Sequence, residues 1–464
     1  MKSSFKFSCG IKRILEKYLY PIHNELNNTN PKKLATSGEN DESIKIINFK
    51  LNYYTIVSIL GILFCILWVC IVNTQPFSDF QYYNELANQI ANGGAWGDTY
   101  TSVGYSIVLG FLYKIFGSSL VVAKTFNILL TLVNYIMLYN ILRKVSLNKT
   151  ICKLVYTLFV FFPPNIFYNS ILATEILFTT IFLTITLVYY SNIKYKYVIL
   201  GVLTAINTMI KPFFIVFFFV IFIVELMSNT DIIDVLTHTC IILLTSIIVI
   251  SPWIYRNTKL IGEFTLVSNN KGIVLYINNN SQNHYGRWMP AEEVENSVVL
   301  KKEYIQANMT QKNKFLTTAA KNWIKKHPIQ FMELGFKRLY NTYFVGDDIG
   351  YSLNGTKLNN HLKLFLTKYT NLIRCLIFIP SIIMIFICSV QILISLFKNK
   401  SINSYDVYSI VCFYMFTCIY FVTEGQSRYS FPFIFIIIYF FSYLTGTIHR
   451  QILAKWRVNS QLSK

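Results

Sequence analysis

Charge is scarce in this sequence, and acidic charge most of all. Only 14% of the 464 residues are charged, with 22 Asp and Glu against 42 Lys and Arg, whereas 53% are hydrophobic. That balance excludes an ordinary soluble globular domain and indicates a polytopic membrane protein. The basic residues lie mainly between apolar runs rather than on one surface, so membrane topology explains the net charge of +20 better than nucleic-acid binding does.

Cysteine pairs are missing as well. The nine cysteines are an odd number, lie mostly in or beside apolar runs and include no CxxC pair, so neither a disulfide framework nor a zinc site is predicted. The basic N-terminal segment lacks a signal-peptide core followed by a cleavage site. We therefore expect it to stay in the cytoplasm, with the first apolar run as an uncleaved anchor.

Ten apolar runs approach the length that a helix needs to cross a membrane, which is about 20 residues. The predicted fold is an all-α polytopic membrane protein with about ten transmembrane helices. These helices are expected at 52–73, 119–142, 154–171, 174–190, 197–210, 212–228, 235–253, 366–397, 406–422 and 431–448.

The basic residues set the predicted orientation. With the N-terminus inside, four of the five expected cytoplasmic segments are rich in Lys and Arg, as the positive-inside rule requires, and both termini are cytoplasmic. The apolar segment 103–113 is too short to cross, so it is predicted as an interfacial or re-entrant helix. The five cytoplasmic segments are 143–153, 191–196, 228–234, 398–406 and 449–457.

This topology divides the chain into five parts. The long outer loop is the only soluble-like part, and its His284 and His327 are too far apart in the sequence to suggest a metal site. The parts are a basic cytoplasmic segment (1–50), a transmembrane core (51–253) with the first outer loop (74–118), a mainly helical outer loop (254–364), the C-terminal transmembrane helices (365–448) and a cytoplasmic tail (449–464).

Asp79 lies a few residues beyond the first predicted span, in the sequence SDFQYYNELANQI. It is followed by a helical stripe of apolar residues that ends at Gly93 and Gly94. Two interpretations are open at this point. Asp79 either performs chemistry at the outer membrane surface or only caps the helix, where a carboxylate satisfies free amides and the helix dipole.

Glu175 and Lys211 interrupt apolar sequence at membrane level. Glu175 follows a break at Pro163–Pro164, and Lys211 precedes Pro212, which ends one helix and begins the next. Ionisable groups at that depth are costly and are candidates for function. The alternatives are a glutamate at the water interface, capped by Thr174, and a lysine that snorkels to the headgroups.

Two arginines are expected on the same outer face. Arg256 lies one turn beyond Trp253 at the end of the seventh span, where both residue types are common anchors. Arg428 lies with Glu424 and Tyr429 in a very short turn between two apolar spans. An outward arginine runs against the positive-inside bias, and its planar guanidinium suits a phosphate.

Several segments form an ordered set that covers most of 52–285 and 406–447. They read SDFQYYNELANQI with TSVGYSIVLGFLYKIFG, PPNIFYNSILATEILF, GVLTAINTMIKPF, SPWIYRNTKLIGEF with SNNKGIVLYINNN, and EGQSRYSFPFIF. Together they resemble the GT-C superfamily of polytopic glycosyltransferases, in the branch of the protein O-mannosyltransferases and the lipid A aminoarabinose transferase. The resemblance implies transfer of a sugar from a polyprenyl-phosphate donor to an acceptor hydroxyl outside the membrane.

The resemblance also implies roles for particular residues. It gives Asp79 the place of the catalytic first-loop carboxylate and Glu175 that of a later acidic residue. Many relatives have a second acidic residue after the first, whereas this chain has Phe80, so the division of roles between Asp79 and Glu175 stays open. The remaining substrate-binding positions, which include the cations for the carrier phosphate, are Lys211, Arg256, Arg428 and Tyr429.

One carboxylate with a cluster of cations fits an inverting, single-displacement transfer. The acceptor hydroxyl needs a base, and the departing phosphate needs positive charge. No cofactor is assigned: a divalent metal ion is compatible with the resemblance, but the first outer loop has no DxD pair that would argue for one. The expected partners are a polyprenyl-phosphate sugar donor and a lipid, glycan or protein acceptor, without nucleic acid.

A polytopic transporter, or a lipid-linked glycan flippase or polymerase, is the alternative. A transporter predicts ionisable residues near the bilayer midplane and internal repeats, and no clear repeat is found. The composition, rich in Ile, Asn, Lys and Phe, is typical of an AT-rich genome. The expected location is a bacterial cytoplasmic membrane, and the topology places the active site on its outer face. The sequence does not specify the sugar, the acceptor, the lipid length or the oligomeric state.

Overall fold

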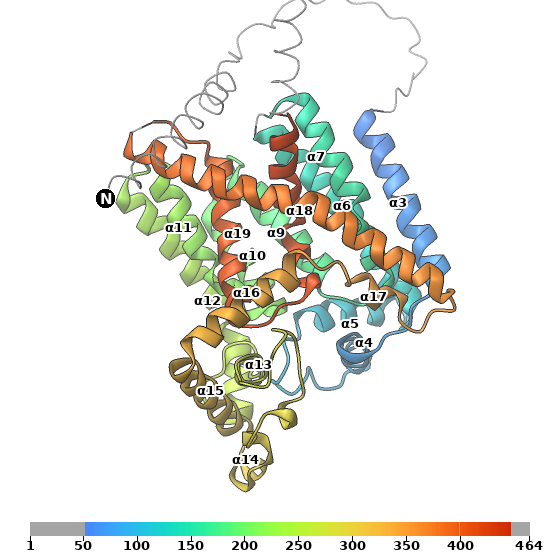
Figure 1. Cartoon of the computed structure of the whole chain (residues 1–464), viewed down its shortest axis with the longest axis vertical. Coiled ribbons are helices and arrows are strands. Elements are labelled where there is room, and N and C mark those ends of the chain that lie inside the picture. The colour runs from blue at the N-terminus through green and yellow to red at the C-terminus, as the bar shows by residue number, and fades with distance from the viewer. Residues whose placement is uncertain (1–51, 146, 399, 447–464) are drawn as a thin grey trace, which may run out of the picture. The chain divides into compact units, whose positions relative to one another are not determined.

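The chain is described here by a computed structural model that covers residues 52–145, 147–398 and 400–446. The predicted cytoplasmic N-terminal segment and tail, with Cys9, lie outside these residues. Within Tyr53–Leu444, which forms one compact unit, every regular element of the described chain is a helix (Figure 1).

Six helices are long and apolar enough to cross a membrane, as a multi-pass membrane protein requires. They are α3 (Tyr53–Val72), α6 (Leu120–Lys144), α12 (Ile232–Ile261), α18 (Asn360–Phe397), α19 (Ser404–Val422) and the helical stretch Ser427–Gly446, which begins with the 3₁₀ turn η5 (Ser427–Phe433). A seventh candidate is a broken span, bent by 50°, made of α7 (Lys149–Phe161) followed by α8 (Pro163–Phe167) and η1 (Tyr168–Ser170).

The other three predicted spans form shorter helices. They are α9 (Glu175–Tyr189), α10 (Lys196–Ile210), and η2 (Pro212–Val216) continued by α11 (Phe217–Met227). Each lies below the usual crossing length of about 20 residues, so the number of ten spans stays a prediction. The chain breaks at Pro163 and Pro212 are where the sequence predicts them, because proline is favoured in the first turn of a helix.

Two long helices extend beyond the boundaries that hydropathy predicts. α12 continues to Ile261, eight residues past 253, and its polar last turns are held by Asn257, which donates to the carbonyl of Val267 at 3.0 Å. α18 begins at Asn360, before the predicted start at 366, because the side chain of Asn359 caps it by accepting from the amide of His361 at 2.9 Å. Hydropathy marks only the apolar part of such helices.

The first outer loop forms a packed helix pair, α4 (Ser78–Ala91) and α5 (Gly104–Phe116). The short apolar segment 103–113 accordingly is a helix of 13 residues. The two helices approach closely at Gly110, where a Cβ would lie 2.9 Å from the Cβ of Ile90 and 3.0 Å from the carbonyl of Ala87. At the N-terminal end of α5, Ser102 donates to the carbonyl of Ile210 at 3.0 Å, which ties the loop to the end of α10.

Gly110→Ala is expected to lower the free energy of unfolding by about 1–3 kcal/mol, because the added methyl group overpacks the contact between α4 and α5. The gain in helix propensity is smaller than this cost. Gly350→Ala is the matched control, since a Cβ at that position meets nothing within 4 Å. Thermal unfolding of the purified protein in detergent measures both, and equal stability of the two variants would contradict the prediction.

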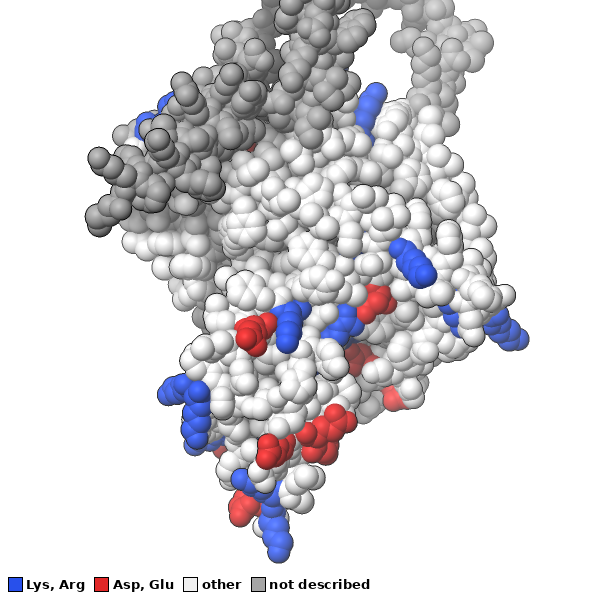
Figure 2. All heavy atoms as spheres, viewed as in Figure 1, with Lys and Arg blue, Asp and Glu red and all other residues white. Residues whose placement is uncertain are grey.

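The long outer loop is mainly helical. It packs a small core around Tyr276, Ile277 and Leu316, and its longest helix begins with a reciprocal capping box between Asn308 and Gln311. Figure 2 shows few charged side chains over the spanning helices on this face, and most of them over the end where α13–α16 lie. The helices of the loop are α13 (Lys271–Asn278), α14 (Lys302–Gln306), α15 (Met309–Lys326), α16 (Pro328–Tyr343) and α17 (Ile349–Leu353), with short turns η3 (Ala291–Glu293) and η4 (Val298–Leu300).

Candidate functional site

Two loops that are far apart in the sequence meet at Asp79 and Arg428. Arg428 Nη2 donates to Asp79 Oδ2 at 3.0 Å, and the side chain of Asp79 remains 51% exposed. Asp79 lies in the first turn of α4, where the helix dipole favours a carboxylate. The N-cap of α4 is nevertheless Phe77, and no side chain caps it. Asp79 is therefore not the N-cap residue, although its place in the first turn lets it interact with the helix dipole; its part in chemistry stays a prediction.

A second ion pair joins the start of α9 to the end of α10. Lys211 Nζ donates to Glu175 Oε1 at 3.2 Å, and the side chains are 14% and 2% exposed. Glu175 is thus buried, with Thr174 as the N-cap of α9, and Lys211 is held by Glu175; the depth of both side chains in a membrane stays a prediction. The hydroxyl of Thr174 donates to the same carboxylate at 3.3 Å.

The ring of Tyr429 connects the two ion pairs. Lys211 Nζ lies 5.6 Å from the ring centroid, and the guanidinium carbon of Arg428 lies 5.4 Å from it. The charge of Arg428 also acts on Glu175, so the two pairs are close enough to influence one another. Ammonium and guanidinium groups bind carboxylate and phosphate oxygens alike, so the site is able to exchange a carboxylate partner for a phosphate.

Tyr83 belongs to the same cluster, although the sequence suggests only a packing role for it. Burial raises the pKa of its phenol, and the negative charge of Asp79, one turn earlier in α4, raises it further. The hydroxyl therefore stays protonated at neutral pH and is available as a hydrogen-bond donor among Asp79, Arg428 and Glu175.

The turn before Arg428 is held by a chain of side-chain hydrogen bonds. Tyr429 donates its hydroxyl to Glu424 Oε2 at 2.7 Å, and the amide nitrogen of Gln426 donates to the other oxygen of Glu424. The hydroxyl of Tyr351 donates to Gln426 Oε1 at 3.0 Å, and its ring lies 5.5 Å from the guanidinium carbon of Arg428. These contacts fix the direction in which Arg428 points.

A fully buried ion pair lies beneath this turn. Arg374 Nη2 of α18 donates to Asp348 Oδ2 at 3.0 Å, and the side chains are 0% and 1% exposed. Arg374 Nη1 also donates to the hydroxyl of Ser430 at 2.6 Å and the carbonyl of Ser427 at 3.3 Å. Burial raises the pKa of Asp348 even with Arg374 beside it, because desolvation outweighs the attraction. Through Ser427 and Ser430, Arg374 holds the segment that carries Arg428 on both sides of that residue.

Asp347, the neighbour of Asp348, binds the same segment from a more solvent-exposed position. It accepts from Arg287 Nη1 and from the hydroxyl of Ser427, each at 2.6 Å. Burial raises the pKa of Asp347, but these hydrogen bonds and the charge of Arg287 outweigh burial and leave the pKa below its usual value. A depressed pKa keeps the carboxylate charged at neutral pH, so this tie is lost only as acid protonates it.

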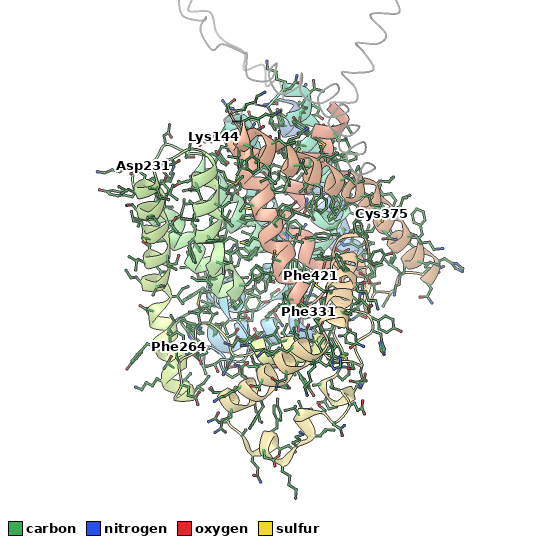
Figure 3. The ribbon with its side chains drawn as sticks, turned by 60° about the vertical axis from the view of Figure 1, so that its left-hand side comes forward. Lys144, Asp231, Phe264, Phe331, Cys375 and Phe421 are labelled. Carbon is green, nitrogen blue, oxygen red and sulfur yellow. The ribbon has the colours of Figure 1, made fainter. Side chains whose placement is uncertain are left out.

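The turn also rests on α16. The amide of Gly425 donates to the carbonyl of Gly286 at 3.0 Å, and a Cβ at position 425 would lie only 2.4 Å from the Cα of Arg338. Arg338 itself is buried and donates to the carbonyl of Phe421 at 2.6 Å. Figure 3 places Phe421 next to Phe331 of α16, in agreement with ring centroids 5.8 Å apart.

Arg256 contacts a different group of residues. Its guanidinium stacks over Trp253 at 4.4 Å and donates to the carbonyls of Gly97 at 2.6 Å and Trp96 at 3.1 Å. It also donates to the side chain of Asn257 at 2.8 Å. Among the described residues, no ion pair joins Arg256 to either carboxylate of the cluster. It anchors the turn between α4 and α5, and its role as a carrier-phosphate cation stays a prediction.

The structure thus brings together five of the six residues that the sequence singles out, and Arg256 lies apart. Sequence reasoning misses the supporting residues, because nothing in a single chain assigns a buried arginine in an apolar helix to a partner. The adjacent aspartates in VGDDIGY are the one feature of the sequence that points to these residues, because the rest of that loop is mainly basic. The missed residues are Tyr83, Arg287, Asp347, Asp348, Tyr351 and Arg374.

No group of three His, Cys, Asp or Glu in the described part of the chain is arranged to hold a metal ion. The carboxylates of the cluster are each paired with a cation or with neutral donors.

No protein-family model matches the sequence, and no curated protein matches it. Two crystal structures of the Archaeoglobus fulgidus oligosaccharyltransferase align with it, each at a TM-score of 0.47 and 12% identity. One is the apo form, and the other is tethered by a disulfide bond to an acceptor peptide containing the NVT sequon. The alignments cover 89% and 85% of this chain but 52% and 49% of the neighbour, so this chain spans about half its length. These values assign the chain to no family.

Proposed function

We propose that this chain is a GT-C-type membrane glycosyltransferase that transfers a sugar from a polyprenyl-phosphate donor to an acceptor hydroxyl, on the outer face of a bacterial cytoplasmic membrane. The observation that carries the proposal is the meeting of two cation–carboxylate pairs, Arg428–Asp79 and Lys211–Glu175, on the ring of Tyr429. Such a site offers positive charge for a phosphate and an exposed base beside it.

Binding of the donor brings its phosphate to both cations. The phosphate oxygens take the place of the Asp79 carboxylate at Arg428 and share the ammonium of Lys211 with Glu175. Asp79 is then free to accept a proton. The acceptor oxygen attacks the anomeric carbon, the carbon–oxygen bond to the phosphate breaks with its electron pair on the leaving oxygen, and the acceptor proton moves to Asp79. A single displacement of this kind inverts the anomeric centre.

The different exposure of the two carboxylates supports different roles. Asp79 is about half exposed and is accessible to an acceptor from outside, whereas Glu175 is 1% exposed and bonded to Lys211. A buried carboxylate that holds a lysine suits positioning rather than proton transfer with a water-borne acceptor. We therefore assign the base to Asp79 and the orientation of Lys211 to Glu175.

The proposal is tested by donor consumption. The full chain is reconstituted in liposomes and given a panel of radiolabelled polyprenyl-phosphate sugars, with water or extracted cell-envelope glycans as acceptor. Consumption of one donor, with the sugar released or transferred, is expected. If no donor is consumed while a labelled lipid-linked sugar changes leaflet, the chain is a flippase, and the transferase proposal fails.

Arg428→Gln is expected to weaken binding of that donor about 10- to 100-fold, because a charge-assisted hydrogen bond is worth about 1.5–3 kcal/mol. Lys211→Gln is combined with Glu175→Gln so that no lone buried carboxylate remains, and a similar loss is expected. Binding of the donor to the purified protein measures both. Lys259→Gln, which removes an exposed cation from α12, is the control and should keep full affinity. Unchanged donor affinity in both cluster variants would exclude this phosphate site.

A further inference from the structure

A groove lies at the end of the α9–α10 pair that is remote from the candidate site. The turn between these helices, residues 190–195, is separated from Glu175 by the whole of α9, which at 1.5 Å per residue is about 20 Å. Figure 3 places Asp231, the N-cap of α12, at the same end of the molecule as Lys144, the last residue of α6. The groove has a volume of about 480 Å³ and runs from the α9–α10 turn to Ile241 of α12.

The lining of the groove is polar at one end and apolar at the other. Ser191, Asn192 and Lys196 supply hydroxyl, amide and ammonium groups. Ile193 and Val198 supply apolar surface, and these residues are 42% and 41% exposed. The apolar end continues into the exposed outer surface of α12, a candidate membrane span, where Leu244 is 59% and Ile248 is 68% exposed. A lipid with a charged headgroup and apolar chains matches this order of surfaces.

The cation at the polar end is held in place. Lys196 Nζ lies 4.7 Å from the ring centroid of Tyr197 and 5.3 Å from that of Tyr189. Lys194, in the turn, lies over the ring of Tyr195 at 4.8 Å. Lys196 lines the groove together with Asn192, and Lys194 lies two residues earlier in the same turn, so both lysines lie near enough in the chain to supply charge for a phosphate.

A buried glutamate, Glu225, fixes the wall of the groove. Tyr197 donates its hydroxyl to Glu225 Oε1 at 2.8 Å, and His238 Nδ1 lies 2.8 Å from Glu225 Oε2. The rings of Tyr197 and His238 stack with centroids 3.6 Å apart. Both oxygens of Glu225 are therefore occupied by neighbours. Asp234, in the first turn of α12, is exposed and is the other acidic group whose charge reaches Tyr197.

We propose that this groove binds an anionic phospholipid of the surrounding membrane, with its phosphate between Lys194 and Lys196 and its chains along Ile193, Val198 and α12. The Glu225–His238 pair also joins α11 to α12, and that role explains the buried glutamate but neither the groove nor Lys196 in its lining. The proposal is independent of the proposed transferase activity, because the groove contains none of the residues of that site.

The test uses the full chain, purified in a non-ionic detergent and titrated with phosphatidylglycerol or phosphatidylcholine. Native mass spectrometry counts the retained lipid, and thermal unfolding reports its effect. Wild type is expected to retain phosphatidylglycerol preferentially and to unfold at a higher temperature with it. The double variant Lys194→Gln/Lys196→Gln should bind it about 30-fold more weakly, because each of the two lysines near an anionic lipid contributes on the order of 1 kcal/mol.

Two further variants separate the groove from general charge effects. Lys149→Gln/Lys153→Gln removes two exposed charges from α7, including one that lies over the ring of Tyr53, and should bind phosphatidylglycerol as wild type does. Ile241→Trp fills the groove without changing charge and should weaken binding. The proposal is overturned if Lys194→Gln/Lys196→Gln and Ile241→Trp both bind as wild type, if the two lipids bind equally, or if inorganic phosphate gives the same stabilisation as the lipid.

Discussion

Asp79→Asn is expected to reduce sugar transfer about 10²- to 10⁴-fold, the usual contribution of a general base, while donor binding is kept. The amide cannot accept the acceptor proton, but it occupies the same space as the carboxylate. Donor affinity should be equal or higher, because Arg428 loses the anion that competes with the donor phosphate. Single-turnover transfer and donor binding, measured separately on the reconstituted protein, distinguish the two effects.

Glu85→Gln is the matched control for Asp79→Asn. Glu85 lies on the same helix and is exposed, and within the described chain its carboxylate accepts a hydrogen bond only from Gln81 of that helix, at 2.7 Å. It should transfer at the wild-type rate. Transfer at the wild-type rate by Asp79→Asn, together with loss of transfer in Glu175→Gln, would reverse the roles that exposure assigns to the two carboxylates.

Arg374→Ala should cost about 3–5 kcal/mol of stability, because it leaves the carboxylate of Asp348 buried without its partner. The same change removes hydrogen bonds to Ser427 and Ser430, so the segment that carries Arg428 should loosen. Unfolding of the detergent-solubilised protein measures the first effect. Hydrogen exchange of the amides in 424–430 measures the second effect.

Two comparisons make this prediction specific to the buried pair. Arg287→Ala breaks the ion pair between Arg287 and Asp347, whose two side chains are 35% and 40% exposed. This change should lower the free energy of unfolding by only about 0–1 kcal/mol. The double variant Arg374→Met/Asp348→Leu removes both buried charges and should be more stable than Arg374→Ala alone. A loss for Arg374→Ala no larger than that for Arg287→Ala would show that the buried pair does not hold the turn.

Hydropathy and proline positions predict most of the helices correctly, since both are local properties of the chain. The breaks at Pro163 and Pro212, the helix of the first outer loop and the helical character of the long outer loop all follow from them. The C-terminal end of α12 and the start of α18 cannot be predicted from hydropathy, because capping and polar contacts extend a helix beyond its apolar part. Hydropathy places the three shorter segments at α9, α10 and α11 without deciding whether each crosses.

For the candidate site too, the sequence determines some features and the tertiary structure decides the others. The sequence by itself determines which residues are unusual, because a charged side chain beside apolar spans is costly wherever it lies, and this singles out Asp79, Glu175, Lys211 and Arg428. Only the tertiary structure decides their partners: Arg428 reaches Asp79 across 349 positions of the chain. Periodicity and hydropathy describe a few helical turns at a time, whereas ion pairing depends on how distant helices pack. Arg374 therefore supports the site only because α18 packs against the turn that carries Arg428.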